Sequence, residues 1–417
     1  MNPGNDAPAI RFEAGRWIIP GLATAHSHAF QRALRGRTQR RTTRAGTFRG
    51  WRDEMYRLVQ GIGPDDLYAI SRFAYTELAM SGVTAVGEFH YVHHGPGGRP
   101  YEVRTELADA VVRAALDVGI RICLIRTAYL RAGYRQSAVP AQERFIDPSI
   151  DLVMQDLDDL RTRYADDPHV AVAVAAAVHS VRAVPIPGIR TLAAYADEHD
   201  IPFHMHVSEQ RGELEECRAE HGTTPVALLS NEGVLSPRFV AVHATHLEDP
   251  EVSALGENHS FVCICRTTER DLGDGLPPTS GLLDAGARLC VGVDSHACEN
   301  AFEEARAVEL DERSRLERRH ATAEGRDLLD AATRQGYAAC GLEPQWQEDR
   351  VHLDGNDPSI AAIDLDCAPD AIFFGATPRA VESVVVAGRQ IIAEGCHAQY
   401  DETLALYRKS LKKLQLI

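Results

Sequence analysis

Apolar residues in this chain fall into short continuous runs that are separated by longer segments with helical periodicity. The apolar runs occupy residues 18–28, 83–89, 120–125, 169–178, 201–207, 239–243, 261–265 and 287–293. The helical patterns occupy 64–80, 102–118, 150–165, 188–199, 223–231, 299–319 and 324–341. Strand-length runs that are apolar through most of their length, rather than at every second position, are typical of parallel strands buried on both faces.

About eight strand and helix units before residue 345 fit a (β/α)8 barrel, which is an α/β fold. The alternative is a doubly wound open sheet, but no glycine-rich phosphate-binding sequence follows an early strand. Beyond residue 345 the pattern predicts short strands at 371–374 and 381–392 and an amphipathic helix at 402–414. We therefore expect residues 1–17 to be a short N-terminal part of a β appendage, 18–345 to be the barrel, and 346–417 to be the C-terminal part of the appendage with its terminal helix.

Composition narrows the classes of partner. The 417 residues carry a formal net charge of −16, which argues against nucleic acid or an anionic membrane as the main partner. No apolar run reaches the roughly 20 residues that span a bilayer, and no signal peptide is recognisable. Nine scattered cysteines favour free thiols in a cytoplasmic protein. Cys263 and Cys265 lie in an apolar run, so we expect small buried side chains there rather than metal ligands.

Residues 32–52 are rich in arginine. We expect most of these side chains to lie in a solvated surface loop, and one or two to face a pocket. The acidic chain as a whole disfavours a nucleic-acid arm. The eight arginines are Arg32, Arg35, Arg37, Arg40, Arg41, Arg44, Arg49 and Arg52.

Histidine and aspartate recur where the predicted strands end. His26 and His28 are two residues apart at the end of the first strand, so they share one face of it. His206 and His243 end the fifth and sixth strands, and Asp294 follows the eighth. Because functional side chains of β/α barrels gather at the carboxyl ends of the strands, this recurrence predicts a metal site. Three imidazoles and a carboxylate suit a divalent first-row metal, most simply Zn²⁺, with Fe²⁺ or Mn²⁺ as alternatives.

Spacing alone does not choose between His204 and His206, which share a face of the fifth strand. His206 is nearer the strand end and is the better ligand, so we expect His204 to be a buried, hydrogen-bonded structural residue. A metal with an open position lowers the pKa of a bound water to about 7. Asp294 could take the proton of that water, and Glu209, three residues after His206, could pass it to a leaving group.

These residues resemble the amidohydrolase superfamily: His-x-His on strand one, histidines on strands five and six, and aspartate on strand eight. Within it the resemblance is closest to the formiminoglutamate deiminases, the imino-hydrolysing enzymes of histidine degradation, and it extends from about Pro20 to the end of the barrel. The segments that carry it are 26–33, 51–56, 88–94, 179–184, 243–246 and 272–275.

The resemblance implies a role for each matching residue. His26, His28, His206 and Asp294 would hold one zinc, Glu209 would be the acid/base residue, and His243 would assist at the bound water. Substrate contacts would come from Gln31, Arg52, Tyr91, His179 and Arg182. Arginines from two separate elements suit a small dicarboxylate, and the alternative for each is a surface ion pair. A homodimer is also implied.

The implied reaction is hydrolysis of N-formimino-L-glutamate to N-formyl-L-glutamate and ammonia. Asp294 with His243 would accept a proton from water, and Glu209 would deliver one to the departing nitrogen. One alternative is a related deaminase acting on a cyclic amidine such as a purine or pterin, although a neutral ring does not need two arginines. The other is a barrel that binds metal without catalysis, which the presence of Glu209, His243 and Asp294 disfavours.

The chain departs from the family pattern in two places. Only about 17 residues precede the His-x-His strand, where the superfamily usually has several strands, so we expect either a misassigned start of the sequence or a trimmed appendage. Arg266 stands where the family usually has proline, and we expect it to shift the loop after strand seven.

Overall fold

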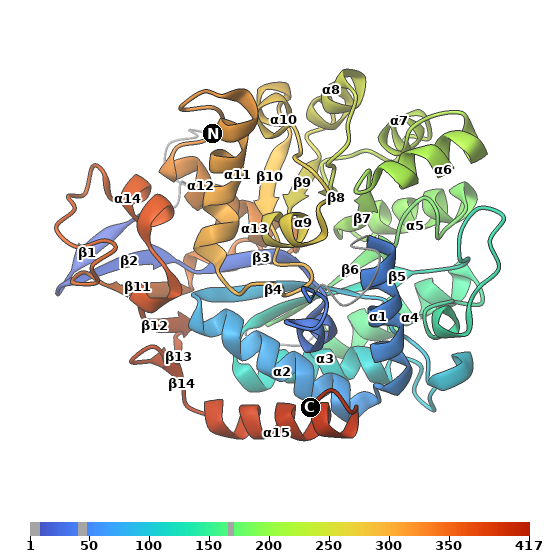
Figure 1. Cartoon of the computed structure of the whole chain (residues 1–417), viewed down its shortest axis with the longest axis horizontal. Coiled ribbons are helices and arrows are strands. Elements are labelled where there is room, and N and C mark those ends of the chain that lie inside the picture. Colours follow the sequence, from blue (N-terminus) through green and yellow to red (C-terminus); the bar gives the residue numbers. More distant parts are fainter. Residues whose placement is uncertain (1–8, 41–47, 166–170) are drawn as a thin grey trace.

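The computed structural model describes residues 9–40, 48–165 and 171–417, and its larger part is a barrel of eight parallel strands (Figure 1). The strands pair in chain order, and a parallel bridge between Ser27 and Asp294 closes the ring. The predicted (β/α)8 fold is therefore confirmed. The strands are β3 (Leu22–Ser27), β4 (Val83–His90), β5 (Arg121–Ala128), β6 (Val172–Val178), β7 (Phe203–Val207), β8 (Phe239–His243), β9 (Phe261–Ile264) and β10 (Arg288–Val291).

The strands form because both of their faces are covered. Every residue of β4 and β5 is buried, as expected for a parallel strand that faces the barrel interior on one side and helices on the other. The predicted strand at 169–178 is observed from Val172 onward, and residues 169 and 170 lie outside the described residues.

The helices surround the barrel (Figure 1). Local signals fix several of their ends: the Ser149 side chain caps α4 by accepting from the Leu152 backbone N–H, and Gly119 ends α3 at φ 90°. They are α1 (Phe48–Gly61), α2 (Pro64–Met80), α3 (Glu106–Val118), α4 (Ile150–Tyr164), α5 (Ile186–Glu198), α6 (Arg211–His221), α7 (Pro225–Asn231), α8 (Asp249–Glu257), α9 (Arg266–Leu272), α10 (Thr279–Ala285), α11 (Ala301–Leu316), α12 (Gly325–Ala332) and α13 (Arg334–Ala339). Short 3₁₀ helices are η1 (Ala29–Leu34), η2 (Pro96–Gly98), η3 (Pro140–Arg144), η4 (Gln345–Gln347) and η5 (Pro378–Ala380).

The second sheet is antiparallel and is built from both ends of the chain. In spatial order its strands are β1 (Arg11–Glu13), β2 (Arg16–Pro20), β11 (Arg350–Asp354), β12 (Val381–Val386), β13 (Arg389–Ala393) and β14 (Cys396–His397). The two strands before the His-x-His strand thus join the C-terminal strands, with β2 pairing along β11.

One apolar stretch of the sequence, residues 18–28, contributes a strand to each of the two sheets. Residues 18–28 read as a single strand, but β2 ends at Pro20 and β3 begins at Leu22. Gly21 makes the turn between them where space is tightest: a Cβ there would lie 2.1 Å from Thr84 Oγ1 and 2.7 Å from Asp349 Cβ.

The predicted strand at 371–374 is wrong, because these residues belong to α14 (Ala368–Gly375). Pro369 occupies the first turn of this helix, where its missing N–H costs nothing. A four-residue apolar run does not distinguish a short strand from a buried helical turn, and here Ile372 and Phe373 are buried by packing.

The appendage is fastened to the base of the barrel by a buried ion pair. Arg121 donates two hydrogen bonds to the Asp349 carboxylate, at 2.8 and 2.9 Å, and Asp349 also accepts from the Tyr337 hydroxyl at 2.6 Å. All three side chains are buried. Removing one partner of such a pair leaves an uncompensated charge and costs about 3–5 kcal/mol.

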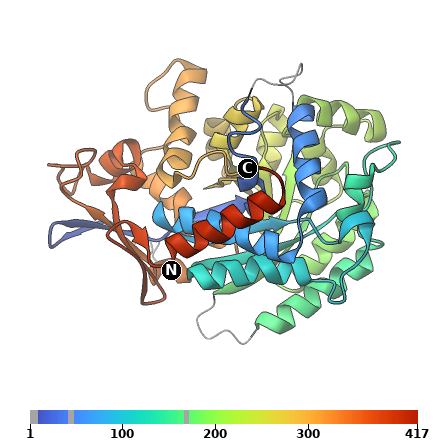
Figure 2. The same cartoon turned by 60° about the horizontal axis from the view of Figure 1, so that its bottom comes forward.

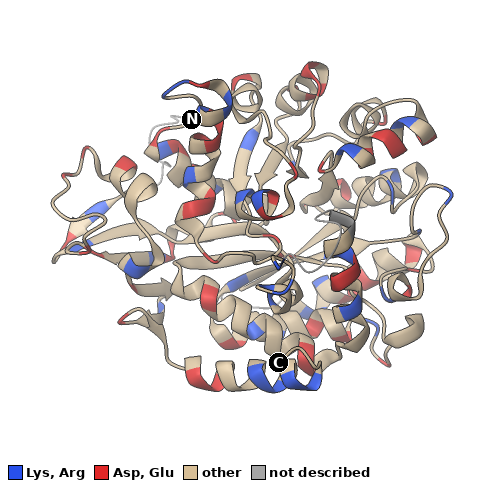
Figure 3. Cartoon of the chain, in the orientation of Figure 1, with Lys and Arg blue, Asp and Glu red and all other residues tan. Residues whose placement is uncertain are grey.

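The last helix, α15 (Tyr400–Lys413), lies along α2 on the outside of the barrel (Figure 2). The Tyr407 and Phe73 rings stack with centroids 4.4 Å apart, and Lys413 Nζ lies 2.5 Å from Asp66 Oδ2. The helix carries acidic residues in its first turn and lysines in its last, the arrangement that the helix dipole favours (Figure 3).

Several expectations about the surface can be compared with the described residues. Arg32 and Arg35 both contact Glu77 and are only partly exposed, so the expectation of a solvated loop is wrong for them. Arg41, Arg44 and the side chain of Arg49 lie outside the described residues.

All nine cysteines are free thiols, and Cys263 and Cys265 are buried. Of the described helices, none has the length and apolar character needed to cross a bilayer.

Candidate active site

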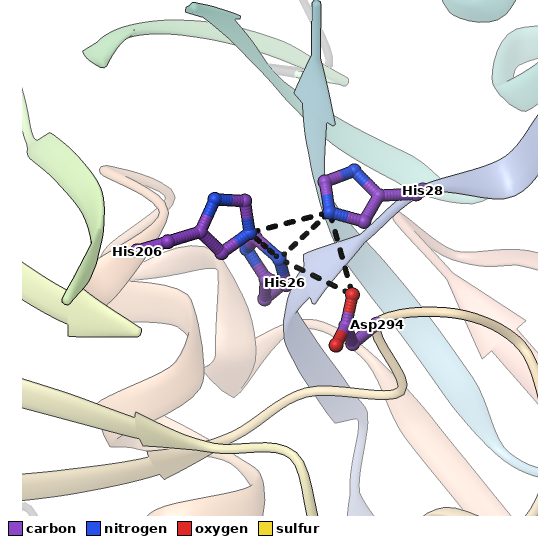
Figure 4. Close-up of side chains that lie close together, drawn as sticks. All are labelled: His26, His28, His206 and Asp294. Carbon is purple, nitrogen blue, oxygen red and sulfur yellow. Dashed lines mark hydrogen bonds and ion pairs between the residues drawn. The ribbon is translucent and has the colours of Figure 1, made fainter. Parts of the chain in front are cut away.

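Four side chains from three strand ends meet at the carboxyl end of the barrel (Figure 4). The Nε2 atoms of His26, His28 and His206 are 3.1–3.3 Å apart, and Asp294 Oδ1 lies 3.5 and 3.3 Å from those of His26 and His28. A tetrahedral metal site with ligand bonds of 2.0–2.1 Å has ligands about 3.3–3.4 Å apart. The observed distances are close to this spacing, so the four residues can ligate a single metal ion, to which a water would be a further ligand.

The histidines of this cluster are held in the form that binds a metal. His28 Nδ1 lies 2.9 Å from the Phe89 carbonyl oxygen and His206 Nδ1 lies 3.1 Å from that of His179, which leaves each Nε2 with a free lone pair. Burial lowers the pKa of His28 to about 3 and lowers those of His26 and His206 well below the usual value. Neutral imidazoles are the form that ligates.

Asp294 is fixed to the first strand by its backbone. Its N–H donates to the His26 carbonyl at 3.1 Å, and its carbonyl accepts from the His28 N–H at 2.9 Å. The residue has φ 52°, an unusual conformation for a residue with a Cβ. Burial raises the pKa of the Asp294 carboxyl to about 7, and a bound cation would oppose that shift.

His204 lies away from this cluster. It is buried, and its Nε2 lies 2.9 Å from the carbonyl oxygen of Ala339 at the end of α13. The position of β7 along the barrel axis, which spacing does not give, brings His206 rather than His204 to the other ligands.

His243 stands between three carboxylates. Its Nε2 lies 4.0 Å from Glu209 Oε1 and 3.7 Å from Asp294 Oδ2, while its Nδ1 lies 3.2 Å from Glu269 Oε1. Burial lowers the pKa of His243, but the neighbouring carboxylates outweigh it and raise that pKa to about 10. The arrangement provides groups that can accept, hold and return a proton beside the ligand cluster.

Sequence reasoning missed Glu269 and did not foresee what Arg266 contacts. Glu269 is wholly buried and accepts from the Cys265 backbone N–H at 3.0 Å, from His243, and from Arg266 Nη1. Arg266 is the first residue of α9 and also pairs with Asp311 at 2.7 Å. Within the described chain the pocket wall does not include Arg266, so this residue acts on the site through Glu269.

A pocket opens over the cluster. The predicted substrate contacts Gln31, Arg52, Tyr91, His179 and Arg182 all line it, together with Glu209 and His243. The wall also contains Trp51, Met55, Tyr56 and Leu272, which lie in segments that carry the family resemblance but were given no role, and Tyr129 and Phe145, which sequence reasoning did not single out. Tyr129 directly follows β5 and could have been found by the strand-end rule, whereas residues of α1 carry no such signal.

Two arginines bring positive charge into this pocket. Arg182 Nη1 donates to the Tyr129 hydroxyl at 3.0 Å and to the Ala132 carbonyl at 2.8 Å. Arg52 Nε is buried and has no hydrogen-bond partner among the described residues. Among the described residues neither arginine has a hydrogen bond to a carboxylate, and two such cations in one pocket indicate a place for an anionic ligand.

Comparison with known proteins identifies the family of this chain. Residues 17–391 match the model of the "Amidohydrolase family". The chain is 35% identical to formimidoylglutamate deiminase of Pseudomonas aeruginosa, over 96% of this chain and 90% of that protein. It is 26% identical to 5'-deoxyadenosine deaminase of Methanothermobacter thermautotrophicus, over 95% and 86% of the two chains. A crystal structure of an amidohydrolase from Brucella melitensis superposes with a TM-score of 0.88 at 28% identity, over 97% of this chain and 95% of that one. The chain therefore belongs to the amidohydrolase family and is a metal-dependent hydrolase.

Proposed function

We propose that this hydrolase cleaves an amidine carbon–nitrogen bond and converts N-formimino-L-glutamate to N-formyl-L-glutamate and ammonia, as a step of histidine degradation. The observation that carries the proposal is the pairing, in one pocket, of two arginines with an acid/base cluster beside a metal-ligand set. The similarity to formimidoylglutamate deiminase supports the same substrate.

Zinc is the metal we propose, and Fe²⁺ or Mn²⁺ would also suit three imidazoles and a carboxylate. The three Nε2 atoms lie 3.1–3.3 Å apart and Asp294 Oδ1 lies 3.3 Å from that of His28, a spacing that suits one first-row ion with a water as a further ligand. When bound by His26, His28, His206 and Asp294, the ion would lower the pKa of a water and make hydroxide available near neutral pH.

The neighbouring side chains then handle protons. We assign the first proton, released by the attacking water, to Asp294 and His243, whose groups lie 3.7 Å apart; a cation bound at the cluster would lower the pKa of His243 and so free its Nε2 to accept. Glu209 lines the pocket next to His243, receives this proton as a carboxylate, and delivers it to the nitrogen that leaves as ammonia. The substrate amidine is cationic at neutral pH, so the carboxylates of Glu209 and Asp294 also favour its binding.

The substrate carboxylates face the other side of the pocket in this proposal. Arg52 comes from α1 and Arg182 from the segment after β6, so each can engage a different carboxylate. Charge-assisted hydrogen bonds from a guanidinium fork suit carboxylates better than a neutral purine or pterin ring. The amide nitrogen of Gln31 donates to the Tyr91 hydroxyl at 3.1 Å, and its buried Oε1 has no partner among the described residues, so this oxygen can accept from the substrate N–H.

A substrate panel tests the assignment. Zinc-loaded protein would be assayed for ammonia release from N-formimino-L-glutamate, 5'-deoxyadenosine and 8-oxoguanine under the same conditions. We expect kcat/KM for N-formimino-L-glutamate to exceed the other two by at least about 100-fold, the effect of about 3 kcal/mol of selective binding. A preference for either purine compound would overturn the substrate assignment, and the family membership would stand.

A further inference from the structure

Two tyrosine hydroxyls in the pocket wall have no role so far. Tyr56 belongs to α1, and Tyr129 follows β5 and is 2% exposed. Phe145 packs against both rings, with centroids 6.0 Å from Tyr56 and 5.8 Å from Tyr129. Both tyrosines line the same pocket as the ligand histidine His28.

Gln142, on η3, determines whether the hydroxyls of these tyrosines donate or accept the hydrogen bonds that they make with it. Its Oε1 accepts from the Val139 backbone N–H at 3.0 Å, which fixes the orientation of the amide. Its Nε2 therefore faces the tyrosines and donates to Tyr56 at 3.1 Å and to Tyr129 at 3.4 Å. A primary amide has two hydrogens, so it supplies both bonds, and each phenol oxygen acts as an acceptor.

The hydroxyl hydrogens of Tyr56 and Tyr129 are therefore not used in these hydrogen bonds. Tyr129 accepts a second bond, from Arg182 Nη1 at 3.0 Å, which again uses the oxygen and not its hydrogen. In the described parts of the chain, neither hydroxyl hydrogen has an acceptor within hydrogen-bond distance. A cation lies beside each ring: the Arg52 guanidinium lies 5.8 Å from the Tyr56 ring centroid, and that of Arg182 lies 5.9 Å from the Tyr129 ring centroid.

This end of the pocket thus offers two unused O–H donors, each beside an arginine. We propose that Tyr56 and Tyr129 each donate a hydrogen bond to one carboxylate of the substrate, and that Gln142 is the positioning residue that keeps both hydroxyls in the donating state. The inference deepens the proposed function and rests on it. It makes the enzyme selective for small dicarboxylates, because a ligand with a single carboxylate leaves one arginine–tyrosine pair unused.

Three substitutions test the inference on zinc-loaded full-length protein. Gln142→Glu keeps the shape and the contact with Val139, but its carboxylate accepts both phenol hydrogens and so withdraws both donors from the substrate. We expect KM for N-formimino-L-glutamate to rise about 10- to 100-fold, with kcat within about threefold of wild type. Tyr56→Phe and Tyr129→Phe each remove one donor and should raise KM about 10-fold. The control is Tyr68→Phe, whose hydroxyl bonds Asp117 at 2.6 Å on the outside of α2, and it should leave KM unchanged.

A binding measurement separates this inference from the reaction itself. Calorimetric titration with N-formyl-L-glutamate should show about 10-fold weaker binding in each phenylalanine variant. N-formyl-γ-aminobutyrate lacks the α-carboxylate, so only one of the two tyrosine substitutions should weaken its binding. Unchanged KM and unchanged N-formyl-L-glutamate affinity in both phenylalanine variants, with circular dichroism showing them folded, would overturn the inference. A wild-type protein that binds the dicarboxylate without releasing ammonia from the formimino compound would instead overturn the proposed reaction.

Discussion

Glu269→Gln is the substitution that most sharply tests how this site is built. Glu269 is wholly buried, and its two oxygens serve three donors: His243 Nδ1 at 3.2 Å, the Cys265 N–H at 3.0 Å, and Arg266 Nη1. Glutamine of nearly the same shape can keep its oxygen toward His243 and Cys265. Its NH₂ group then faces Arg266, donor against donor.

The expected loss of stability follows from replacing the oxygen that faces Arg266 by an NH₂ group. Losing one buried charge-assisted hydrogen bond costs about 1.5–3 kcal/mol, and Arg266 keeps Asp311 as a second partner, which limits the loss. We therefore expect the free energy of unfolding to fall by about 2 kcal/mol. Because the oxygen that faces His243 Nδ1 then belongs to a neutral amide, the hydrogen bond that orients His243 loses its charge assistance, and we also expect kcat to fall about 10- to 100-fold.

Denaturant unfolding and steady-state ammonia release measure the two effects separately. Glu303→Gln is the matched control, since Glu303 pairs with Arg270 at 2.7 Å and its side chain is 31% exposed. That variant should change stability by less than about 1 kcal/mol and leave kcat unchanged. A Glu269→Gln enzyme with lowered stability and wild-type kcat would refute the role in orienting His243, and wild-type values of both would refute the whole argument.

Three further substitutions probe separate parts of the account. Glu209→Gln should lower kcat by about 10²- to 10⁴-fold while the zinc content measured by atomic emission stays at wild type, and full activity would remove it as the acid/base residue. Arg52→Lys keeps the charge but loses the guanidinium fork, so KM should rise about 10-fold in steady-state assays, and an unchanged KM would place Arg52 outside the substrate contacts. Burial raises the pKa of Glu304 to about 8 from an ordinary value of 4.5, so the folded state binds this proton more tightly than the unfolded state. Stability should therefore fall as pH rises from about 4.5 to about 8, and Glu304→Gln should remove up to about 4 kcal/mol of that fall in denaturant titrations. Parallel profiles of stability against pH for wild type and Glu304→Gln would contradict this role of Glu304.

The fold could be predicted from the sequence because continuous apolar runs and helical periodicity both follow from how strands and helices are buried. Strands buried on both faces need continuous apolar runs, so β4 and β5 were recognisable, and their number predicted a barrel. The exceptions are local. Residues 371–374 are too few to separate strand from helix, and the turn at Gly21 depends on Thr84 and Asp349, which are distant in the sequence.

The site residues likewise fall into those that the sequence could predict and those that it could not. Residues at strand ends, such as His26 and Asp294, were predictable because the barrel brings every strand end to one face. Their assignment as ligands, like the roles given to Glu209 and Arg182, remains a prediction. Glu269 could not be found from the sequence, because its importance lies in three donors that only the fold assembles around it. Tyr56 lies in a segment that carries the family resemblance, but its place in the pocket was missed because a helix that covers the pocket has no strand-end signature.

Product analysis of a single reaction tests the central claim most directly. N-formimino-L-glutamate has two carbon–nitrogen bonds at its formimino carbon, and the proposed reaction breaks the one to the terminal nitrogen. Zinc-loaded protein should yield ammonia and N-formyl-L-glutamate in equal amounts, measured by enzymatic ammonia assay and proton NMR. Formamide and L-glutamate would mean that the other bond is cleaved, and absence of any product from protein that contains about one zinc per chain would contradict the proposed substrate.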